Sequence, residues 1–217
     1  HAKKMNGRIS GLYAITPDLA DTQKLIQQVR LALEGGTRWL QYRNKSADQL
    51  LRLQQATALI CLCREFAVPL IINDSLDVAL EINADGLHLG AQDCLISDAK
   101  SKLGADKIIG ASCYDNLQRA LEAETGGADY VTFGSFFAST VKPEAARAPL
   151  KLLREAKERL SIPVVAVGGI NLDNAGSLIA AGADAVAVIS ALFNAKDIRE
   201  TAKNFAALFA DYHHGVA

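Results

Sequence analysis

The feature that most constrains the fold is a regular alternation of short apolar runs with longer amphipathic ones. The short runs are rich in β-branched residues, as buried strands are, and they predict strands at Leu12–Ile15, Trp39–Arg43, Leu70–Asn73, Gly86–Leu89, Ile108–Ser112, Tyr130–Phe133, Val164–Val167 and Ala185–Ile189. Helical patterns between them include Ala47–Phe66, Leu117–Glu124, Pro149–Leu160 and Ile198–Tyr212. Such alternation indicates parallel strands with right-handed crossovers. We therefore predict an α/β fold, a (βα)8 TIM barrel with eight parallel strands; a doubly wound open sheet is the alternative.

A weak internal repeat supports this prediction. The stretches "NADGLHL", "GADYVTF" and "GADAVAV" begin at residues 83, 127 and 182, and each ends a helix and opens a strand. Since no linker or charge run divides the chain, we expect residues 1–217 to form a single barrel domain. The residues His1–Lys4, which precede Met5, look like an extension added in cloning.

Composition excludes several classes of protein. Hydrophobic residues make up 50% of the chain, charged residues 22%, and the net charge is −1, which argues against disorder and against a nucleic-acid-binding surface. No apolar run approaches the ~18 to 20 residues of a membrane helix, and the N-terminus lacks the apolar core of a signal peptide. The four cysteines have neither disulfide nor zinc spacing. We therefore expect a cytoplasmic protein with no nucleic-acid or membrane partner.

In TIM barrels the residues at the carboxyl ends of the strands form the active-site rim. Seven of the predicted strands end in polar or glycine-rich residues. In chain order, the polar candidates at this rim are Gln41, Arg43, Lys45, Asn73, Asp74, Asp93, Ser112, Ser139 and Lys142.

Two acids at this rim suit a hard cation. Asp74 and Asp93 follow adjacent strands, and two carboxylates that leave room for phosphate oxygens are a usual arrangement for Mg²⁺. Asp74 is alternatively an N-cap for the helix in "SLDVAL", a role for which Ser75 is an equally good candidate.

Three cations around the same rim suit a pyrophosphate. Arg43, Lys45 and Lys142 carry these charges, and Asn73 adds a neutral donor. A solvated side chain in the first turn of a helix is the alternative for Lys45. For His88, within the fourth strand, we expect a hydrogen-bonded core position in preference to a catalytic base.

The last two strands suit a phosphate monoester. They end in "VAVGGI" and "VAVIS", at the place where barrels bind phosphate with backbone amides and a short helix. Gly168 and Gly169 would allow close approach of the backbone, and Ser190 would add its own N–H; a glycine-rich turn without a ligand is the alternative. The rim thus suits two anionic substrates that are joined between the two sites.

Six motifs in this order resemble the thiamine-phosphate synthase family: "QYRNK", "INDSLDVAL…ADGLHLGAQD", "GASCYD", "DYVTFGSFFASTVK", "VVAVGGI" and "ADAVAVISALF". The resemblance covers Gly11 to about Phe193. It implies a Mg²⁺-dependent transferase that condenses 4-amino-2-methyl-5-hydroxymethylpyrimidine pyrophosphate with thiazole phosphate, giving thiamine phosphate and pyrophosphate. It implies that the segment Gly134–Pro149 acts as a lid over the rim.

Matched motif by motif, the resemblance also implies roles for particular residues. Gln41 would contact the aminopyrimidine, and Ser112 would lie by this ring or its pyrophosphate. The pyrophosphate would be held by Arg43, Lys45, Asn73 and Lys142. Mg²⁺ would be bound by Asp74 and Asp93. The thiazole phosphate would be bound by Ser139, Gly169, Ile189 and Ser190.

Four positions depart from the family pattern. The chain has Ser75 where the family usually has arginine, Tyr114 where it usually has histidine, and Ala91 and Val141 at two further motif positions. The family resemblance thus leaves two alternatives open: a divergent paralogue that isomerises a thiazole phosphate, and a non-catalytic phosphate-ligand binder or regulator. Whether the protein is a homo-oligomer is also open.

The absence of an arginine at residue 75 raises the question of a substitute cation. Arg147, at the end of the expected lid, is the better candidate, because closure of the lid would bring it over the mouth of the barrel, the opening that the rim surrounds. Arg64, on the helix before the third strand, is expected near the opposite end of that strand.

Overall fold

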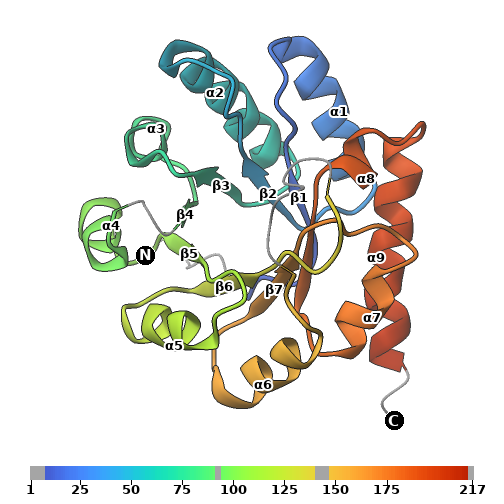
Figure 1. Ribbon diagram of the computed structural model, residues 1–217. Coiled ribbons are helices and arrows are strands. Elements are labelled where there is room, and N and C mark those ends of the chain that lie inside the picture. The colour runs from blue at the N-terminus through green and yellow to red at the C-terminus, as the bar shows by residue number, and fades with distance from the viewer. Residues whose placement is uncertain (1–7, 91–93, 140–146, 215–217) are drawn as a thin grey trace.

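The computed structural model describes residues 8–90, 94–139 and 147–214, with side chains described up to residue 211. Eight parallel strands form a closed barrel in chain order (Figure 1). The strands are β1 (Gly11–Ile15), β2 (Trp39–Tyr42), β3 (Leu70–Asn73), β4 (Gly86–Leu89), β5 (Ile108–Ser112), β6 (Tyr130–Phe133), β7 (Val164–Val167) and β8 (Ala185–Val188). Because β8 pairs with β1, the predicted barrel is confirmed and the open sheet is excluded.

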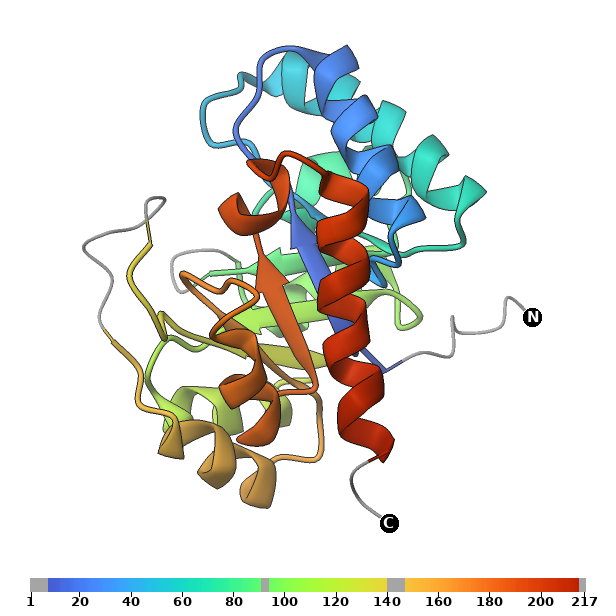
Figure 2. The same cartoon turned by 90° about the vertical axis from the view of Figure 1, so that its right-hand side faces the viewer.

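Helices surround the ring of strands (Figure 1). Within the described ranges they are α1 (Thr22–Glu34), α2 (Gln49–Glu65), α3 (Leu76–Glu81), α4 (Ile96–Leu103), α5 (Leu117–Thr125), α6 (Lys151–Arg159), α7 (Ala175–Ala180), α8 (Ser190–Phe193) and α9 (Ile198–His214). Figure 2 shows α9 running along the outside of the barrel, where it packs against α1 and β1. No helix in these ranges is long and apolar enough to cross a membrane.

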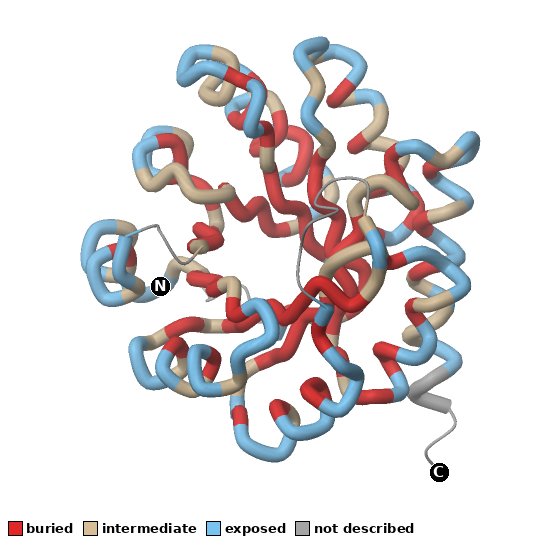
Figure 3. Tube along the Cα trace, in the orientation of Figure 1, coloured by how far each residue is buried: buried red, intermediate tan, exposed pale blue. Residues whose placement is uncertain are grey.

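Alternating side chains along each strand build two separate apolar clusters. Inward-facing residues such as Tyr13, Ile71 and Val165 fill the barrel interior. Their neighbours Leu12 and Ile72 point outward and pack in a larger cluster with apolar residues of the helices. The strands are therefore buried on both faces, as Figure 3 shows for the central ring, which explains their nearly continuous apolar sequences.

The internal repeat joins the strands near their amino ends. Its aspartates, Asp85, Asp129 and Asp184, each accept a backbone N–H of the preceding strand through one carboxylate oxygen, at 2.8 Å in all three cases. The N–H of each aspartate donates in return to the carbonyl of the same partner residue, at 3.1, 2.7 and 2.8 Å. The repeat thus stabilises the rim opposite to the predicted active site.

Candidate active site

A cleft of about 260 Å³ lies beside the barrel rim, between the segments that follow β2 and β3. Its lining residues are Tyr42, Asn44, Lys45, Arg52, Ile72, Asn73, Asp74, Ser75 and Val78. Two cations, one carboxylate and several neutral polar groups therefore face a space close to the ~300 Å³ lower bound of typical ligand pockets. Lys45, Asn73 and Asp74 are brought together as the sequence predicted.

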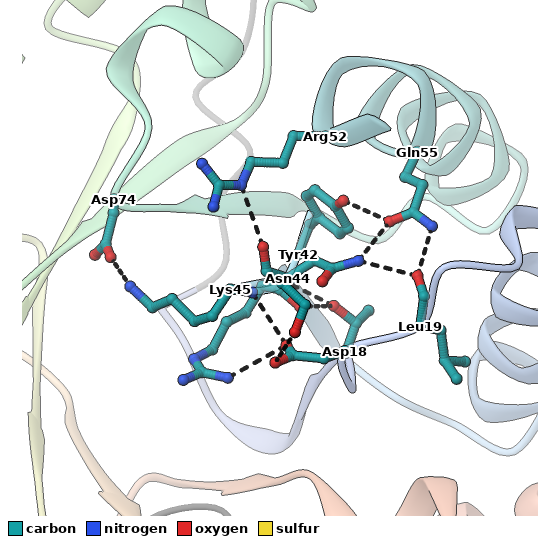
Figure 4. Close-up of polar contacts among 11 residues, drawn as sticks. Asp18, Leu19, Tyr42, Asn44, Lys45, Arg52, Gln55 and Asp74 are labelled. Atoms are coloured by element: carbon teal, nitrogen blue, oxygen red, sulfur yellow. Dashed lines mark hydrogen bonds and ion pairs between the residues drawn. The ribbon is translucent and has the colours of Figure 1, made fainter. Parts of the chain in front are cut away.

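Ser75, and not Asp74, caps helix α3. The Ser75 hydroxyl accepts the backbone N–H of Val78 at 3.4 Å. Asp74 adopts a left-handed backbone with φ of 62°, which is uncommon outside glycine, and its N–H donates to the carbonyl of His88 at 2.9 Å. This conformation leaves the Asp74 carboxylate facing the cleft, where it forms an ion pair with the ammonium group of Lys45 (Figure 4).

A network of hydrogen bonds holds the segment after β2 in place. The Gln55 Oε1 atom, on α2, accepts from the Tyr42 hydroxyl at 2.6 Å and from Asn44 Nδ2 at 3.0 Å. Both amides also donate to the carbonyl of Leu19, Asn44 at 2.9 Å and Gln55 at 2.8 Å (Figure 4). Lys45 therefore starts from a well-fixed backbone.

Arg52 is a site residue that the sequence prediction missed. It lies one turn into α2, and its Nε–H donates to the Asn44 carbonyl at 3.2 Å (Figure 4). It lines the same cleft as Ser75. Its position in the sequence could have indicated this role, because a residue in the first turns of the helix that follows β2 lies near the carboxyl end of β2 and therefore near the rim. Arg64 lies in the last turn of the same helix, as expected, and Arg147 is exposed.

Arg43 points to a different partner. Its guanidinium lies 3.5 Å from Asp18 Oδ1, and the same carboxylate oxygen accepts the N–H of Lys45 at 3.1 Å. Arg43 is not among the residues that line the cleft. Only Nη1 of Arg43 is recorded next to Asp18, so the other N–H groups of this guanidinium remain for the predicted contact with pyrophosphate, which stays a prediction.

Gln41 and Ser112 lie on the inner side of the rim and are joined through a buried polar chain. Gln41 Nε2 donates to the Tyr13 hydroxyl at 2.9 Å, and His88 Nε2 lies 2.8 Å from Ser112 Oγ. His88 Nδ1 lies 2.9 Å from the Tyr130 hydroxyl. His88 is thus a hydrogen-bonded core residue, as expected.

On the other side of the rim, the glycines after β7 give space to the segment after β6. A Cβ atom on Gly169, whose φ is 65°, would lie 2.3 Å from the Ala138 carbonyl oxygen. The N–H groups of Phe136 and Phe137 donate to the carbonyls of Val167 and Gly168. These glycines therefore allow close approach of the protein's own backbone, whereas the sequence prediction assigned that approach to a phosphate.

The remaining predicted residues of this side lie close by in the chain. Ile189 precedes the short helix α8, which starts at Ser190, and both residues are half-buried at the end of β8. Ser139 is half-buried at the edge of the described segment. Asp93 and Lys142 lie outside the described residues, as do Ala91, Val141 and the middle of the expected lid.

The donor chemistry of the cleft fits Mg²⁺. Asp74 offers a carboxylate at the rim, next to Asn73, and Mg²⁺ is commonly bound by one or two carboxylates together with substrate phosphates and water. Among the residues with described positions, no group of three His, Cys, Asp or Glu side chains is placed to hold a metal. Of the described residues, Asp74 alone therefore offers a carboxylate in this cleft, and a Mg²⁺ ion here would need further oxygen ligands such as substrate phosphate and water.

Comparisons with known proteins agree on one family. A family model described as thiamine monophosphate synthase matches residues 12–192. Thiamine-phosphate synthase of Nitrosomonas eutropha is 54% identical over 202 residues, 93% of this chain and 95% of the relative. That of Nitrosospira multiformis is 55% identical over 201 residues, 93% of this chain and 86% of the relative.

Among solved structures, one belongs to the same family and another shares the fold alone. The thiamine phosphate pyrophosphorylase of Pyrococcus furiosus superposes with a TM-score of 0.83 at 39% identity, covering 93% of this chain and 96% of that one. A 3-hexulose-6-phosphate synthase superposes with a TM-score of 0.70 at 17% identity, covering 91% of this chain and 99% of that one, a likeness of fold alone.

Proposed function

The chain belongs to the thiamine monophosphate synthase family, and we propose that its barrel rim performs the transfer that defines this family. The enzyme is a transferase that condenses 4-amino-2-methyl-5-hydroxymethylpyrimidine pyrophosphate with thiazole phosphate. The products are thiamine phosphate and pyrophosphate. The observation that carries the placement of this chemistry is the cleft in which Lys45, Arg52 and Asp74 face one another.

The reaction requires a leaving group to depart with its electron pair. The bond between the pyrimidine methylene carbon and the pyrophosphate oxygen breaks, and the thiazole nitrogen then donates its lone pair to that carbon. The electron-rich aminopyrimidine stabilises the cation formed between these two events. No enzyme nucleophile is needed, so the site's main tasks are to stabilise the negative charge of the leaving group and to align the two rings.

The cleft residues suit the first task. Lys45 and Arg52 would bind pyrophosphate oxygens, Lys45 as a point charge and Arg52 through its planar set of N–H donors. Asn73 would add a neutral donor. Arg43, whose Nη1 lies by Asp18, is proposed to join them through its other N–H groups, and Lys142 is proposed as a further cation from the segment after β6.

Asp74 and Asp93 are proposed to hold Mg²⁺, which would neutralise charge on the departing pyrophosphate. The ion pair in the structure suggests how the cleft accommodates this change. In the structure, Lys45 forms an ion pair with Asp74. If the Asp74 carboxylate bound Mg²⁺ instead, the Lys45 ammonium group would be available to bind a phosphate oxygen.

The inner and far sides of the rim suit the second task. Gln41 and Ser112, at the ends of β2 and β5, would orient the aminopyrimidine. Ser139, Gly169, Ile189 and Ser190 are proposed to bind the thiazole phosphate across the mouth. Tight positioning matters because correctly oriented reactants gain many orders of magnitude in rate over free ones.

A direct product assay tests this function. The purified protein is incubated with both substrates and Mg²⁺, and thiamine phosphate is measured by liquid chromatography and mass spectrometry. We expect product at a rate proportional to enzyme, and pyrophosphate in equal amount. Absence of product with both substrates present would refute the proposal, and an isomerised thiazole phosphate in its place would support the paralogue alternative.

A further inference from the structure

Five polar side chains from five strands form one hydrogen-bonded chain across the barrel interior. Gln41 Nε2 lies 2.9 Å from the Tyr13 hydroxyl, which lies 2.7 Å from the Tyr130 hydroxyl. The Tyr130 hydroxyl lies 2.9 Å from His88 Nδ1, and His88 Nε2 lies 2.8 Å from Ser112 Oγ. The two ends of the chain are the residues proposed to orient the pyrimidine. Its three middle residues have no part in that proposal.

The middle of this chain is fixed by packing. Tyr130 stacks on the His88 ring with 5.6 Å between centroids, and it meets the Tyr13 ring edge-on at 5.9 Å. Gly110 pairs with Tyr130 in the sheet, and a Cβ atom on Gly110 would lie only 2.1 Å from Tyr130 Cζ. The absence of a side chain at Gly110 therefore makes room for the Tyr130 ring over β5 and leaves it little freedom to move.

The protons of this chain can be counted. Burial raises the pKa of Tyr13 and of Tyr130 above the ordinary value of a tyrosine, so each hydroxyl keeps its single proton. The Tyr13 oxygen accepts from Gln41, so its own proton goes to the Tyr130 oxygen. The Tyr130 proton then goes to His88 Nδ1, which must carry no hydrogen. A neutral imidazole in this state has its proton on Nε2 and donates it to Ser112.

This order of donors has a consequence at each end. The Gln41 N–H₂ group donates inside the barrel, to the Tyr13 hydroxyl. Among the described residues, the side-chain atoms that are fully buried without a hydrogen-bond partner belong to Gln28 and Asn44, so the Gln41 Oε1 atom is not one of them. Ser112 accepts from His88 and keeps its own proton for another partner. The chain therefore presents an acceptor at Gln41 and a donor at Ser112 to the mouth.

We infer that Tyr13, Tyr130 and His88 are positioning residues that hold the Gln41 amide with Oε1 toward the mouth, so that the site selects an amino-substituted heteroaromatic ring over its oxo counterpart. An amino group donates to Oε1, whereas an oxo group would face it with a second acceptor. The inference deepens the proposed function and rests on it for the identity of the ring. The order of donors within the chain does not depend on that identity.

The first test reads the histidine tautomer without substrate. In ¹⁵N-histidine-labelled protein, the imidazole nitrogens of His88 are observed by NMR, with His88→Gln to assign the signal. We expect a neutral ring protonated on Nε2. A proton on Nδ1 would reverse every donor in the chain, would turn the Gln41 N–H₂ group toward the mouth, and would overturn the inference.

The second test measures selectivity in Tyr130→Phe. Without the Tyr130 hydroxyl, the Tyr13 proton has only the Gln41 amide left to bind, so we expect this amide to rotate and its carbonyl to turn inward. Dissociation constants are measured for the aminopyrimidine pyrophosphate and for its oxo analogue. We expect the preference for the amino compound to fall about tenfold, with the affinity for thiazole phosphate unchanged.

Two further variants make the result decisive. Thr37→Val is the control, because it removes another buried hydroxyl, which donates to the Ala32 carbonyl at 2.7 Å near the amino end of β2; it should keep the wild-type preference. If Tyr130→Phe does not fold, Tyr13→Phe releases Gln41 directly and should lose the preference. An unchanged preference in the folded variant refutes the inference. Failure of the wild-type protein to make product would refute the proposed function alone. The order of donors would still be tested, because the His88 tautomer is measured without substrate.

Discussion

Replacing Arg52 with glutamine removes one of the two cations that line the cleft while keeping a polar, uncharged side chain. Arg52 is half-buried, and its Nε–H already donates to the Asn44 carbonyl. If the guanidinium binds pyrophosphate, the variant should bind the pyrimidine pyrophosphate more weakly. The thiazole phosphate, which binds across the mouth, should be unaffected.

The size of this effect follows from the exposure of the cleft. Two unit charges about 4 Å apart interact by roughly 1 kcal/mol in water and roughly 4 kcal/mol at an effective dielectric constant of about 20. Because the cleft opens to solvent, salt and water screen the contact, and we expect about 1 to 2 kcal/mol. This corresponds to a rise of about 5- to 30-fold in the KM of the pyrimidine pyrophosphate.

Steady-state kinetics with each substrate varied in turn measure this effect. Arg64→Gln is the matched control, because it removes the same charge from the last turn of the same helix and should leave both KM values unchanged. Arg52→Lys, which keeps the charge but loses the planar N–H donors, should lie between wild type and Arg52→Gln. An unchanged pyrimidine KM in Arg52→Gln, or an equal change in Arg64→Gln, would refute the placement of pyrophosphate in this cleft.

Three other predictions concern the cleft, the opposite rim and the buried thiols. Ser75→Arg adds a cation to the cleft and should lower the KM of the pyrimidine pyrophosphate several-fold in the same assay; an unchanged KM would contradict this prediction. The same change removes the α3 cap and should lower the free energy of unfolding by about 1 kcal/mol. Asp184→Ala leaves the Val164 N–H without its partner and should lower the free energy of unfolding by about 1 to 3 kcal/mol in urea titrations, with kcat unchanged. Burial raises the pKa of Cys63 and of Cys113 to about 12. Because the unfolded chain ionises these thiols near pH 9, the free energy of unfolding should fall as the pH rises from about 9 to about 12. A Cys63→Ala, Cys113→Ala double variant should show a smaller fall.

Local patterns were sufficient to predict the barrel. The bounds of β3 to β7 agree with the prediction, and those of β1, β2 and β8 differ by one residue at one end. Strands buried on both faces carry their signal in four or five consecutive residues, so no distant information is needed. Helix α6 starts at Lys151, two residues later than predicted, where the sequence offers no capping side chain to mark the start. That the chain is a single domain stays a prediction.

Contacts between distant residues could not be predicted in this way. The sequence could not choose between Asp74 and Ser75 as a helix cap, because both are good caps; the left-handed backbone at Asp74 decides it. The Tyr13–Tyr130 contact joins residues 117 positions apart, and neither tyrosine lies at the carboxyl end of its strand. Arg52 was missed because the prediction considered strand ends and the lid, and no helical residue facing the rim.

The most direct test of the account is the kinetics of Asp74→Asn. The central claim is that Asp74 serves the departing pyrophosphate through a cation, so its loss should affect chemistry more than binding. Since charge on the leaving group grows in the transition state, we expect turnover at saturating Mg²⁺ to fall by at least ~10²-fold. The dissociation constant of thiazole phosphate should stay at the wild-type value. Near-wild-type turnover in Asp74→Asn would contradict the claim.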